Sequence, residues 1–463
     1  MKSIREHWAS RWGFVLAAIG SAVGLGSFWR FPYMVGENGG GPFVLLYVVF
    51  TLIIGIPIFI GELIIGRKAQ CSPIFAFRVL SKRSSKWNMV GWLNLLTSLV
   101  VLSFYCVVSG WCLSYALMSL NQCFLQKTPG QVQNIFSLIY SSTGANVFWL
   151  LIFILLNVGV VFGGVRKGIE HWSRILTPAL LFIVVVIFCY AFTLHGFAHA
   201  VRFIFYPNFS KFTPSAVLNA LGMSFYTMSI GLGIIITYGS YLAPDENLHK
   251  TSFIVAMTTI FVSLMAALVM FPIVFTFDFP MKNGAGLVFE TMPILFSKLP
   301  GSLIISTIFF FLFVFTSLTS SISMVEVMVA NIMELLNWSR ARAVVASAIG
   351  IFILGIPSAL SGSKVIFPNW EAIYGRDFFS TMNYISASWM MPIAGLFTTI
   401  FVGYVMKREI AKEEFLKGAT MKCLFYPWIF TMRYLAPVAI ILVILGETNV
   451  VDVTKIMHYF DRS

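Results

Sequence analysis

Two glycine-rich runs have the residue types needed to bind a small charged ligand, and each lies inside a long apolar segment. They are Gly20-Ser-Ala-Val-Gly-Leu-Gly26 and Ser229-Ile-Gly-Leu-Gly233. Glycine costs about 1 kcal/mol relative to alanine inside a helix, so both runs disfavour a continuous helix. An interrupted helix frees N–H groups, which suit a carboxylate, and carbonyls, which suit a small hard cation such as Na⁺. Small residues also allow close helix packing, but two such runs five segments apart favour interrupted helices.

A third candidate is a dense group of hydroxyl side chains in another apolar segment. Its members are Thr316, Ser317, Thr319, Ser320 and Ser321. Hydroxyl oxygens complete the ligand shell of Na⁺ without adding net charge. The alternative role of such residues is a hydrogen bond back to their own helix. Opposite an interrupted helix, we favour the cation role for this group.

The elements that position these residues must be transmembrane helices. The chain has 463 residues, of which 58% are hydrophobic and 11% charged, and it contains 46 phenylalanines. Soluble proteins are roughly 45–50% apolar and about 25% charged, so the composition excludes a soluble enzyme, a disordered protein and a coiled coil. We predict an all-α integral membrane protein with about 11 spans. The expected spans are 12–35, 41–66, 88–121, 147–163, 175–195, 215–241, 251–278, 302–336, 342–358, 378–405 and 426–446.

The distribution of lysine and arginine predicts how the spans are oriented. The formal charge of +13 lies mostly in short loops, which indicates membrane topology and no nucleic-acid partner. Basic residues are about twice as frequent on the side of the N-terminus, which places that end in the cytoplasm and the C-terminus outside. The two interrupted spans lie five spans apart and enter from opposite sides. We therefore expect a single transporter domain over 1–463, with inverted repeats at about 12–195 and 215–405 and an extra helix at 426–446.

Four segments carry the signature of a known family. They are Arg5–Phe43, Gly55–Arg67, Ser224–Tyr241 and Ser317–Ser323. The sequence resembles the neurotransmitter:sodium symporter family, in particular its bacterial, leucine-transporter-like amino-acid branch. The resemblance implies a 5+5 inverted-repeat fold with helices 1 and 6 broken. It also implies Na⁺-coupled import of an amino acid by alternating access, in a bacterial inner membrane.

The resemblance implies a substrate site between the two breaks. The substrate carboxylate would meet the backbone from Ala22 to Gly26 and the hydroxyl of Tyr105, and the amine would meet carbonyls near Ala22, Tyr226 and Thr227. The pocket for the substrate side chain would be lined by Ser21, Val101, Tyr226, Ser229, Leu232, Ser320 and Met324. Amine-transporting members have an aspartate at the position of Gly24, so glycine there favours a substrate with its own carboxylate. Ser21 and Leu232 enlarge the pocket, which favours a bulky hydrophobic or aromatic amino acid.

The resemblance also implies one or two sodium sites. The second site would use carbonyls of Gly20, Val23 and Thr316 with the hydroxyls of Thr319 and Ser320. The first site would use Ala22, Ser27, Thr227 and Thr259, but the usual amide side chains are missing at Ser27 and Thr259. Chloride-independent relatives carry an acid near Thr259 or Ser263, and neither position is acidic here. Tyr47, Thr227 and Ser263 resemble a chloride pocket in which Met223 replaces the usual glutamine, so chloride dependence stays open.

Gating residues are implied on both sides of the site. The outer gate would pair Arg30 with Asn383, where relatives have an aspartate, and so would be a single charge-assisted hydrogen bond. The inner gate would pair Arg5 with Glu334. Glu62, deep in the second span, would support unwound backbone at a helix break.

Two other functions compete with sodium-coupled transport. The weakened first sodium site would also fit a proton-coupled carrier of the same fold. A membrane transferase would need paired acids at a water-facing loop, and only Asp245 and Glu246 come close. There is no GxxxxGK[ST] phosphate loop and no cytosolic catalytic domain, so we expect neither an ATP-driven pump nor an enzyme. The expected partners are the free amino acid, sodium ions and the lipid bilayer, and the expected assembly is a monomer or weak dimer.

Overall fold

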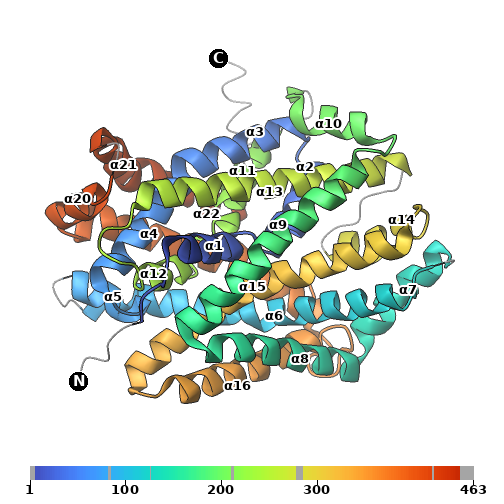
Figure 1. Cartoon of the computed structure of the whole chain (residues 1–463), viewed down its shortest axis with the longest axis horizontal. Helices are drawn as coiled ribbons and strands as arrows, with labels where there is room; N and C mark the ends of the chain where they lie inside the picture. Colours follow the sequence, from blue (N-terminus) through green and yellow to red (C-terminus); the bar gives the residue numbers. More distant parts are fainter. Residues whose placement is uncertain are drawn as a thin grey trace.

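A computed structural model describes residues 6–81, 85–125, 127–209, 213–277, 285–419 and 422–448. Within these residues the chain is helical and has no strands. Most helices run side by side along the long axis of the molecule (Figure 1). The expected all-α architecture is therefore confirmed.

Nine helical segments in the described residues are long and apolar enough to cross a membrane, and a bent pair at the N-terminus makes ten. The nine are Gly41–Ala69 (α3–α4), Asn88–Leu120 (α6), Thr143–Phe162 (α8), Val165–Ala191 (ending in α9), Leu248–Thr276 (α13), Ser302–Leu336 (α15), Arg340–Ala359 (α16), Phe378–Val405 (α18–α19) and Lys422–Glu447 (α21–α22). Together with the expected span 215–241, which is folded as two shorter helices, they account for about eleven spans. Large apolar side chains such as Phe182 and Ile304 remain on the outer surface, as expected for helices that face lipid.

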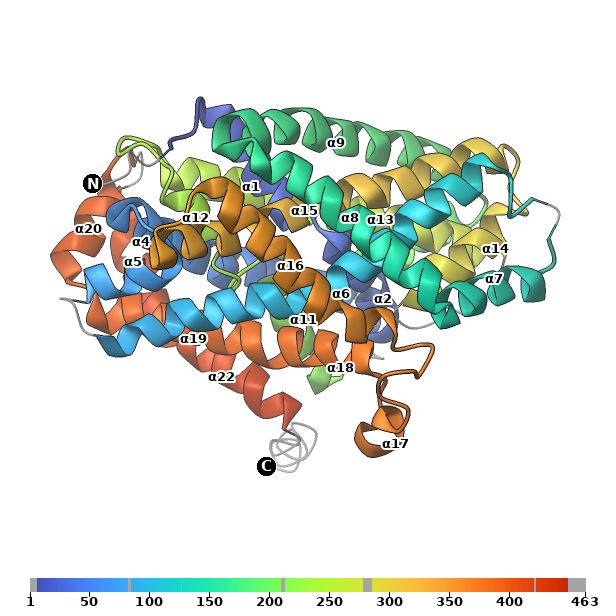
Figure 2. The same cartoon turned by 90° about the horizontal axis from the view of Figure 1, so that it is seen from below.

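Shorter helices connect the spans and cover their ends. They are α5 (Pro73–Leu80), α7 (Pro129–Ser141), α10 (Phe197–Phe205), α14 (Met292–Phe296), α17 (Trp370–Tyr374) and α20 (Arg408–Leu416). Figure 2 shows α4, α5 and α20 at one end of the molecule and α7 and α14 at the other. The connection 122–146, expected as a loop, thus holds a helix, and Thr128 begins it with a capping box that pairs with Gln131.

The first span is broken where its glycines predict. Helix α1 (Arg11–Ala22) ends at Val23, and the chain continues through a π-helical turn (Gly26–Arg30) into α2 (Phe31–Glu37). The two halves meet at an angle of 47°. Short turns replace the regular helical pattern here, because the Gly24 N–H donates to the Ala22 carbonyl and the Gly24 carbonyl accepts from the Ser27 N–H. The Leu25 N–H has no such backbone partner in the described residues and donates to a side chain instead.

The sixth span is broken over a longer stretch. Helix α11 (Pro214–Thr227) ends before a non-helical segment, and α12 begins at Ile234 and ends at Gly239. Ser229, Gly231 and Gly233 have φ angles of +54°, +82° and +73°. This left-handed conformation carries little penalty for glycine and a substantial one for most other residues. The glycines therefore allow the backbone to leave the helical conformation between α11 and α12.

Both breaks face the two longest helices. Helix α15 packs along α6, and α1 lies between α9, α13 and α15. Every residue of α15 from Thr316 to Asn331 is buried, so the serine and threonine hydroxyls of this stretch are surrounded by protein. The division into inverted repeats at 12–195 and 215–405, with 426–446 as an extra helix, stays a prediction.

Candidate functional site

A cavity lies where the two breaks meet α6 and α15. It is lined by both broken segments, α6, α15 and α19. The lining residues are Ser21, Ala22, Gly24, Leu25, Gly26, Val101, Tyr105, Tyr226, Thr227, Ser229, Leu232, Ile234, Ser320, Met324 and Met391. All twelve residues expected around the substrate thus border one space, and Leu25 belongs to the backbone segment that was expected to meet the carboxylate. Ile234 and Met391 were not expected there, because glycine spacing and motifs do not single out ordinary apolar residues.

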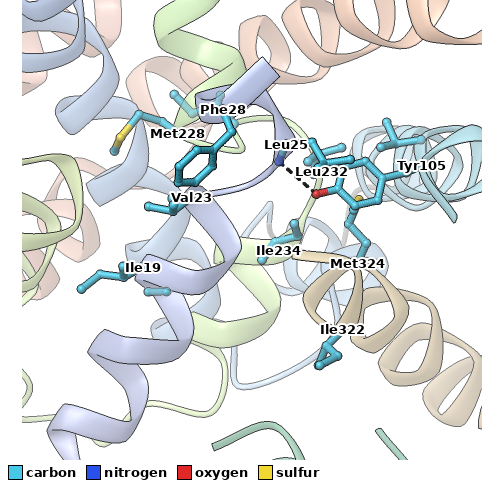
Figure 3. Packing of buried hydrophobic residues seen from close by; sticks show 14 of the residues in the cluster. Ile19, Val23, Leu25, Phe28, Tyr105, Met228, Leu232, Ile234, Ile322 and Met324 are labelled. Atoms are coloured by element: carbon cyan, nitrogen blue, oxygen red, sulfur yellow. Dashed lines mark hydrogen bonds between the residues drawn. The ribbon is translucent and has the colours of Figure 1, made fainter. Parts of the chain in front are cut away.

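Side chains of α6 and α15 hold the backbone of the first break. The Leu25 N–H donates to the hydroxyl oxygen of Tyr105 at 3.2 Å, as Figure 3 shows. The Ser320 hydroxyl donates to the carbonyl of Gly20 at 3.1 Å. A Cβ added at Gly24 would lie 2.8 Å from the Ser320 Oγ and 3.3 Å from the Tyr105 hydroxyl oxygen. Gly24 is therefore the point at which the backbone, Tyr105 and Ser320 come together.

The second break is held by three further hydrogen bonds. One carboxyl oxygen of Glu62 accepts from the Gly231 N–H at 3.0 Å, and the Ser98 hydroxyl donates to the Leu232 carbonyl at 2.6 Å. The Ser229 hydroxyl donates to the Ser21 carbonyl at 3.0 Å, which joins the two breaks directly. Glu62 is completely buried. Its contact with Gly231 is the bracing position that the resemblance implies for it.

We expect Gly231→Ala to lower the apparent unfolding temperature of the purified protein markedly. A Cβ at Gly231 would lie 2.4 Å from the Met391 carbonyl oxygen, and its φ of +82° is strained for alanine. Together these effects are worth roughly 3 kcal/mol. Gly350→Ala is the matched control, because nothing lies within 4 Å of its Cβ position in α16, and this variant should be as stable as the wild type or slightly more stable. Equal unfolding temperatures for both variants would contradict the geometry of this break.

The cavity lining combines polar and apolar groups. The polar groups are the backbone around Gly24 and the hydroxyls of Tyr105 and Ser320. The apolar side chains of Leu232, Ile234 and Met324 also line the cavity, and Figure 3 shows them near Tyr105. Such a lining is suited to a small molecule that has both a charged group and an apolar group.

The residues of the expected second sodium site lie where α1 and α15 touch, next to the cavity. A Cβ added at Gly20 would lie 3.0 Å from the Thr319 Cβ, so the two helices touch at this point. The Thr319 hydroxyl donates to the carbonyls of Phe315 and Thr316, and the Thr316 hydroxyl has no partner among the described residues. Val23 closes α1 beside them. This set of neutral oxygens has the chemistry that Na⁺ requires.

The residues of the expected first sodium site are also buried close to the breaks. Ser27 is fully buried, and its hydroxyl finds no partner in the described part of the chain. Thr227 borders the cavity, and Thr259 donates to the Val255 carbonyl of its own helix at 2.9 Å. The Tyr47 hydroxyl donates to the Thr227 hydroxyl at 3.2 Å and lies 3.3 Å from that of Ser263. Three hydroxyl groups thus meet at one buried point.

Of the two expected gating pairs, only the outer one lies entirely within the described residues. The Arg30 guanidinium lies over the Tyr226 ring, 4.7 Å from its centroid, and no hydrogen bond between Arg30 and Asn383 is present among the described residues. At the other side, one carboxylate oxygen of Glu334 accepts from the Ser72 N–H at 2.8 Å. Arg5 lies outside the described residues.

Sequence reasoning did not predict the ion pair that anchors the inner side. The Trp8 indole donates to the Tyr238 carbonyl at 3.1 Å, and the Trp8 N–H donates to the Tyr241 carbonyl. The Tyr241 hydroxyl in turn donates to buried Glu326 at 2.7 Å, and Glu326 forms an ion pair with Arg340. A charged residue within an apolar span was the only signal in the sequence for this anchor.

Comparison with known proteins identifies this arrangement. The sequence matches the profile of the sodium:neurotransmitter symporter family over residues 5–132 and 130–461. An uncharacterised sodium-dependent transporter of Bacillus subtilis is 35% identical over 447 residues, which are 96% of this chain and 98% of that protein. The neutral amino acid transporter B(0)AT2 of Bos taurus is 30% identical over 304 residues, 59% of this chain and 41% of that protein. The crystal structure of MhsT in complex with L-phenylalanine has a TM-score of 0.87 and 35% identity, and the match covers 95% of this chain and 99% of MhsT.

The profile covers both broken spans and the hydroxyl group of α15, and the solved relative shares the fold over nearly the whole chain. The chain therefore belongs to the sodium:neurotransmitter symporter family and is a multi-pass, sodium-dependent membrane transporter.

Proposed function

We propose that this transporter is a symporter that imports a bulky hydrophobic or aromatic amino acid together with Na⁺ by alternating access. The observation that carries the proposal is the cavity between the breaks, which is lined by glycine backbone, hydroxyl groups and apolar side chains. A zwitterion with an apolar side chain matches such a lining. The neighbouring structure of MhsT contains L-phenylalanine, which supports a substrate of this class.

In this proposal the carboxylate binds at Gly24, Leu25 and the Tyr105 hydroxyl, and the apolar side chain extends toward Leu232 and Met324. One Na⁺ binds at the second site between Gly20 and Thr319. Any second Na⁺ would bind at the first sodium site around Ser27 and Thr227. At this site serine and threonine hydroxyls stand where relatives have longer amide side chains. Binding of cation and carboxylate side by side balances their charges away from water, which couples the two substrates.

The membrane orientation is part of the same proposal. The excess of Lys and Arg places α5, α20 and the N-terminus in the cytoplasm of a bacterial inner membrane. The C-terminus would lie outside, but residues 449–463 lie beyond the described part. Arg30 would close the cavity from outside against the Tyr226 ring, with Asn383 as a further partner. Glu334, with Arg5, would close it from the cytoplasm.

Thermal stabilisation of the purified protein tests the substrate class. Each of the common amino acids is added in Na⁺ buffer and in K⁺ buffer, because a ligand at 100 times its Kd stabilises the folded state by roughly 2.7 kcal/mol. We expect large apolar amino acids to raise the unfolding temperature in Na⁺ only. Uptake into proteoliposomes then tests transport. Equal uptake in Na⁺-free, K⁺-only buffer would refute sodium coupling, and uptake driven by a pH gradient without Na⁺ would establish the proton-coupled alternative.

The hydroxyls that meet at Tyr47, Thr227 and Ser263 favour a bound anion in addition to Na⁺. Tyr47, Thr227 and Ser263 offer hydroxyl donors at one buried point beside the first cation set, where a chloride ion would offset the charge of Na⁺. We therefore propose chloride-dependent uptake.

The substitution Ser263→Asp should make uptake independent of chloride, because a fixed carboxylate replaces the charge of the anion. The measurement is uptake in chloride compared with gluconate, with Ser252→Asp, at another buried serine of α13, as the control that should gain no such independence. Wild-type uptake of the same rate in gluconate would contradict the proposal.

A further inference from the structure

One buried asparagine has an amide group that the protein leaves without partners. Asn94, on α6, is completely inaccessible to solvent, and neither its side-chain oxygen nor its nitrogen has a hydrogen-bond partner among the described residues. Burying an amide without hydrogen bonds is unfavourable, so a sequence that only had to pack this helix would place an apolar residue here. We therefore expect this amide to find its partners in another stage of the transport cycle.

The position of Asn94 connects it to the substrate cavity. Asn94, Ser98, Val101 and Tyr105 follow the spacing i, i+4, i+7, i+11 and so lie along one face of α6. Tyr105 and Val101 border the cavity, and Ser98 donates to the Leu232 carbonyl. Asn94 is the next polar residue of this face toward the end of α6 that lies beside α5 (Figure 2).

Three elements come together around Asn94, and two of them, the second break and α15, also line the cavity. A Cβ added at Gly233 would lie 3.0 Å from the Asn94 Cβ, 3.3 Å from the Pro73 side chain and 3.5 Å from that of Val327. Asn94 is thus enclosed by the second break, the start of α5 and α15. The residue preceding Pro73 repeats the pattern: Ser72 is fully buried, and its hydroxyl also has no partner within the described ranges.

A nearby asparagine shows that this region can satisfy an amide. The Asn331 side-chain oxygen accepts from the Ile74 N–H at 3.3 Å, and its nitrogen donates to the Val327 carbonyl at 2.7 Å. Asn331 thus joins α5 to α15, which is a structural role. Asn94 lies beside the same Val327 and joins nothing.

We propose that Asn94, with Ser72, lines the cytoplasmic exit route and binds water and the departing hydrated Na⁺ once α12 and α5 separate from α6. This inference rests on the proposed transport function and orientation. When the inner side is closed, the route collapses and the amide loses these partners. When it is open, the amide of Asn94 and the hydroxyl of Ser72 offer hydrogen bonds to the ion and the substrate between the cavity and Glu334. These bonds replace part of the water shell that both would have in solution.

The substitution Asn94→Leu separates this role from a structural one. We expect an unfolding temperature equal to or above that of the wild type, an unchanged Kd for Na⁺ and for the amino acid identified by thermal stabilisation, and a turnover in proteoliposomes lower by about ten-fold or more. Asn94→Ser, which keeps a small polar group, should recover most of the turnover. Asn331→Leu is the matched control and should lower the unfolding temperature. A loss of stability in Asn94→Leu like that of Asn331→Leu, or a wild-type turnover, would overturn the proposal.

Reaction of a cysteine at the same position tests access from water directly. The background replaces the accessible native cysteines Cys71, Cys123, Cys189 and Cys423 by alanine. In this background Asn94→Cys should react with a small thiol reagent in K⁺ buffer and be protected in Na⁺ with amino acid. Cys106, buried on a different face of α6, should stay unreactive under both conditions. No reaction of Cys at 94 under any condition would also overturn the proposal. If the wild type itself shows no Na⁺-dependent uptake, the proposed function fails, whereas normal wild-type uptake with an unreactive residue 94 rejects only the exit route.

Discussion

The substitution Gly24→Asp is expected to abolish amino-acid uptake. A Cβ at this position already lies within contact distance of the Ser320 and Tyr105 hydroxyls, so the new carboxylate would lie among the polar groups of the cavity. It would take the Tyr105 hydroxyl as its own partner and repel the carboxylate of the substrate. Two like charges 4 Å apart at an effective dielectric constant of about 20 repel each other by roughly 4 kcal/mol, which weakens binding by about a thousand-fold.

Binding of a matched pair of ligands distinguishes this effect from simple crowding. The affinity of Gly24→Asp is measured for an aromatic amino acid and for the corresponding amine that lacks the carboxylate. The amino acid should lose affinity and the amine should gain it. Gly24→Ala adds the methyl group without the charge, so it should weaken the amino acid less and should not favour the amine. If Gly24→Asp bound the amino acid as tightly as the wild type, the carboxylate would have to bind elsewhere.

The substitution Thr319→Val is expected to raise the Na⁺ concentration needed for half-maximal uptake by ten-fold or more. Valine keeps the shape of threonine, whose Cβ lies where α15 touches Gly20 of α1, but removes its hydroxyl. A hydrogen bond to a charged group is worth about 1.5–3 kcal/mol, and a loss of this size corresponds to roughly ten- to hundred-fold in affinity. Ser320→Ala should also raise the midpoint, because it removes a proposed ligand and the hydrogen bond that positions the Gly20 carbonyl.

A neighbouring serine provides the control for this experiment. The Ser317 hydroxyl, like that of Thr319, donates to a carbonyl of its own helix. Ser317 is not among the residues of the proposed second site, so Ser317→Ala should leave the Na⁺ midpoint unchanged. The measurement is a Na⁺ titration of uptake and of thermal stability at a fixed amino-acid concentration. A midpoint in Thr319→Val identical to that of Ser317→Ala would show that Na⁺ does not use this oxygen.

Local features of the sequence were enough to predict where the two helices break. Gly24 interrupts α1, and Gly231 and Gly233 adopt left-handed conformations within the sixth span. Helix propensity is a property of single residues and their neighbours, and hydropathy is a property of a window, so both can be read without knowledge of the fold. The hydroxyl group of α15 could be picked out by its residue types, whereas Tyr105 of α6 and Met324 of α15 came from the family resemblance and could not come from spacing.

The sequence therefore determined the helical membrane architecture, the two breaks and the kind of ligand that free backbone can bind. Only the tertiary structure decided which side chains hold that backbone. Leu25 meets Tyr105 from 80 residues away, Gly231 meets Glu62, and Arg30 lies over Tyr226 with no bond to Asn383 in the described residues. The unpartnered amide of Asn94 likewise became apparent only when its neighbours were in place. The physical reason is that hydrogen bonds act over about 3 Å, so residues distant in sequence become partners only when the packing of whole helices brings them together.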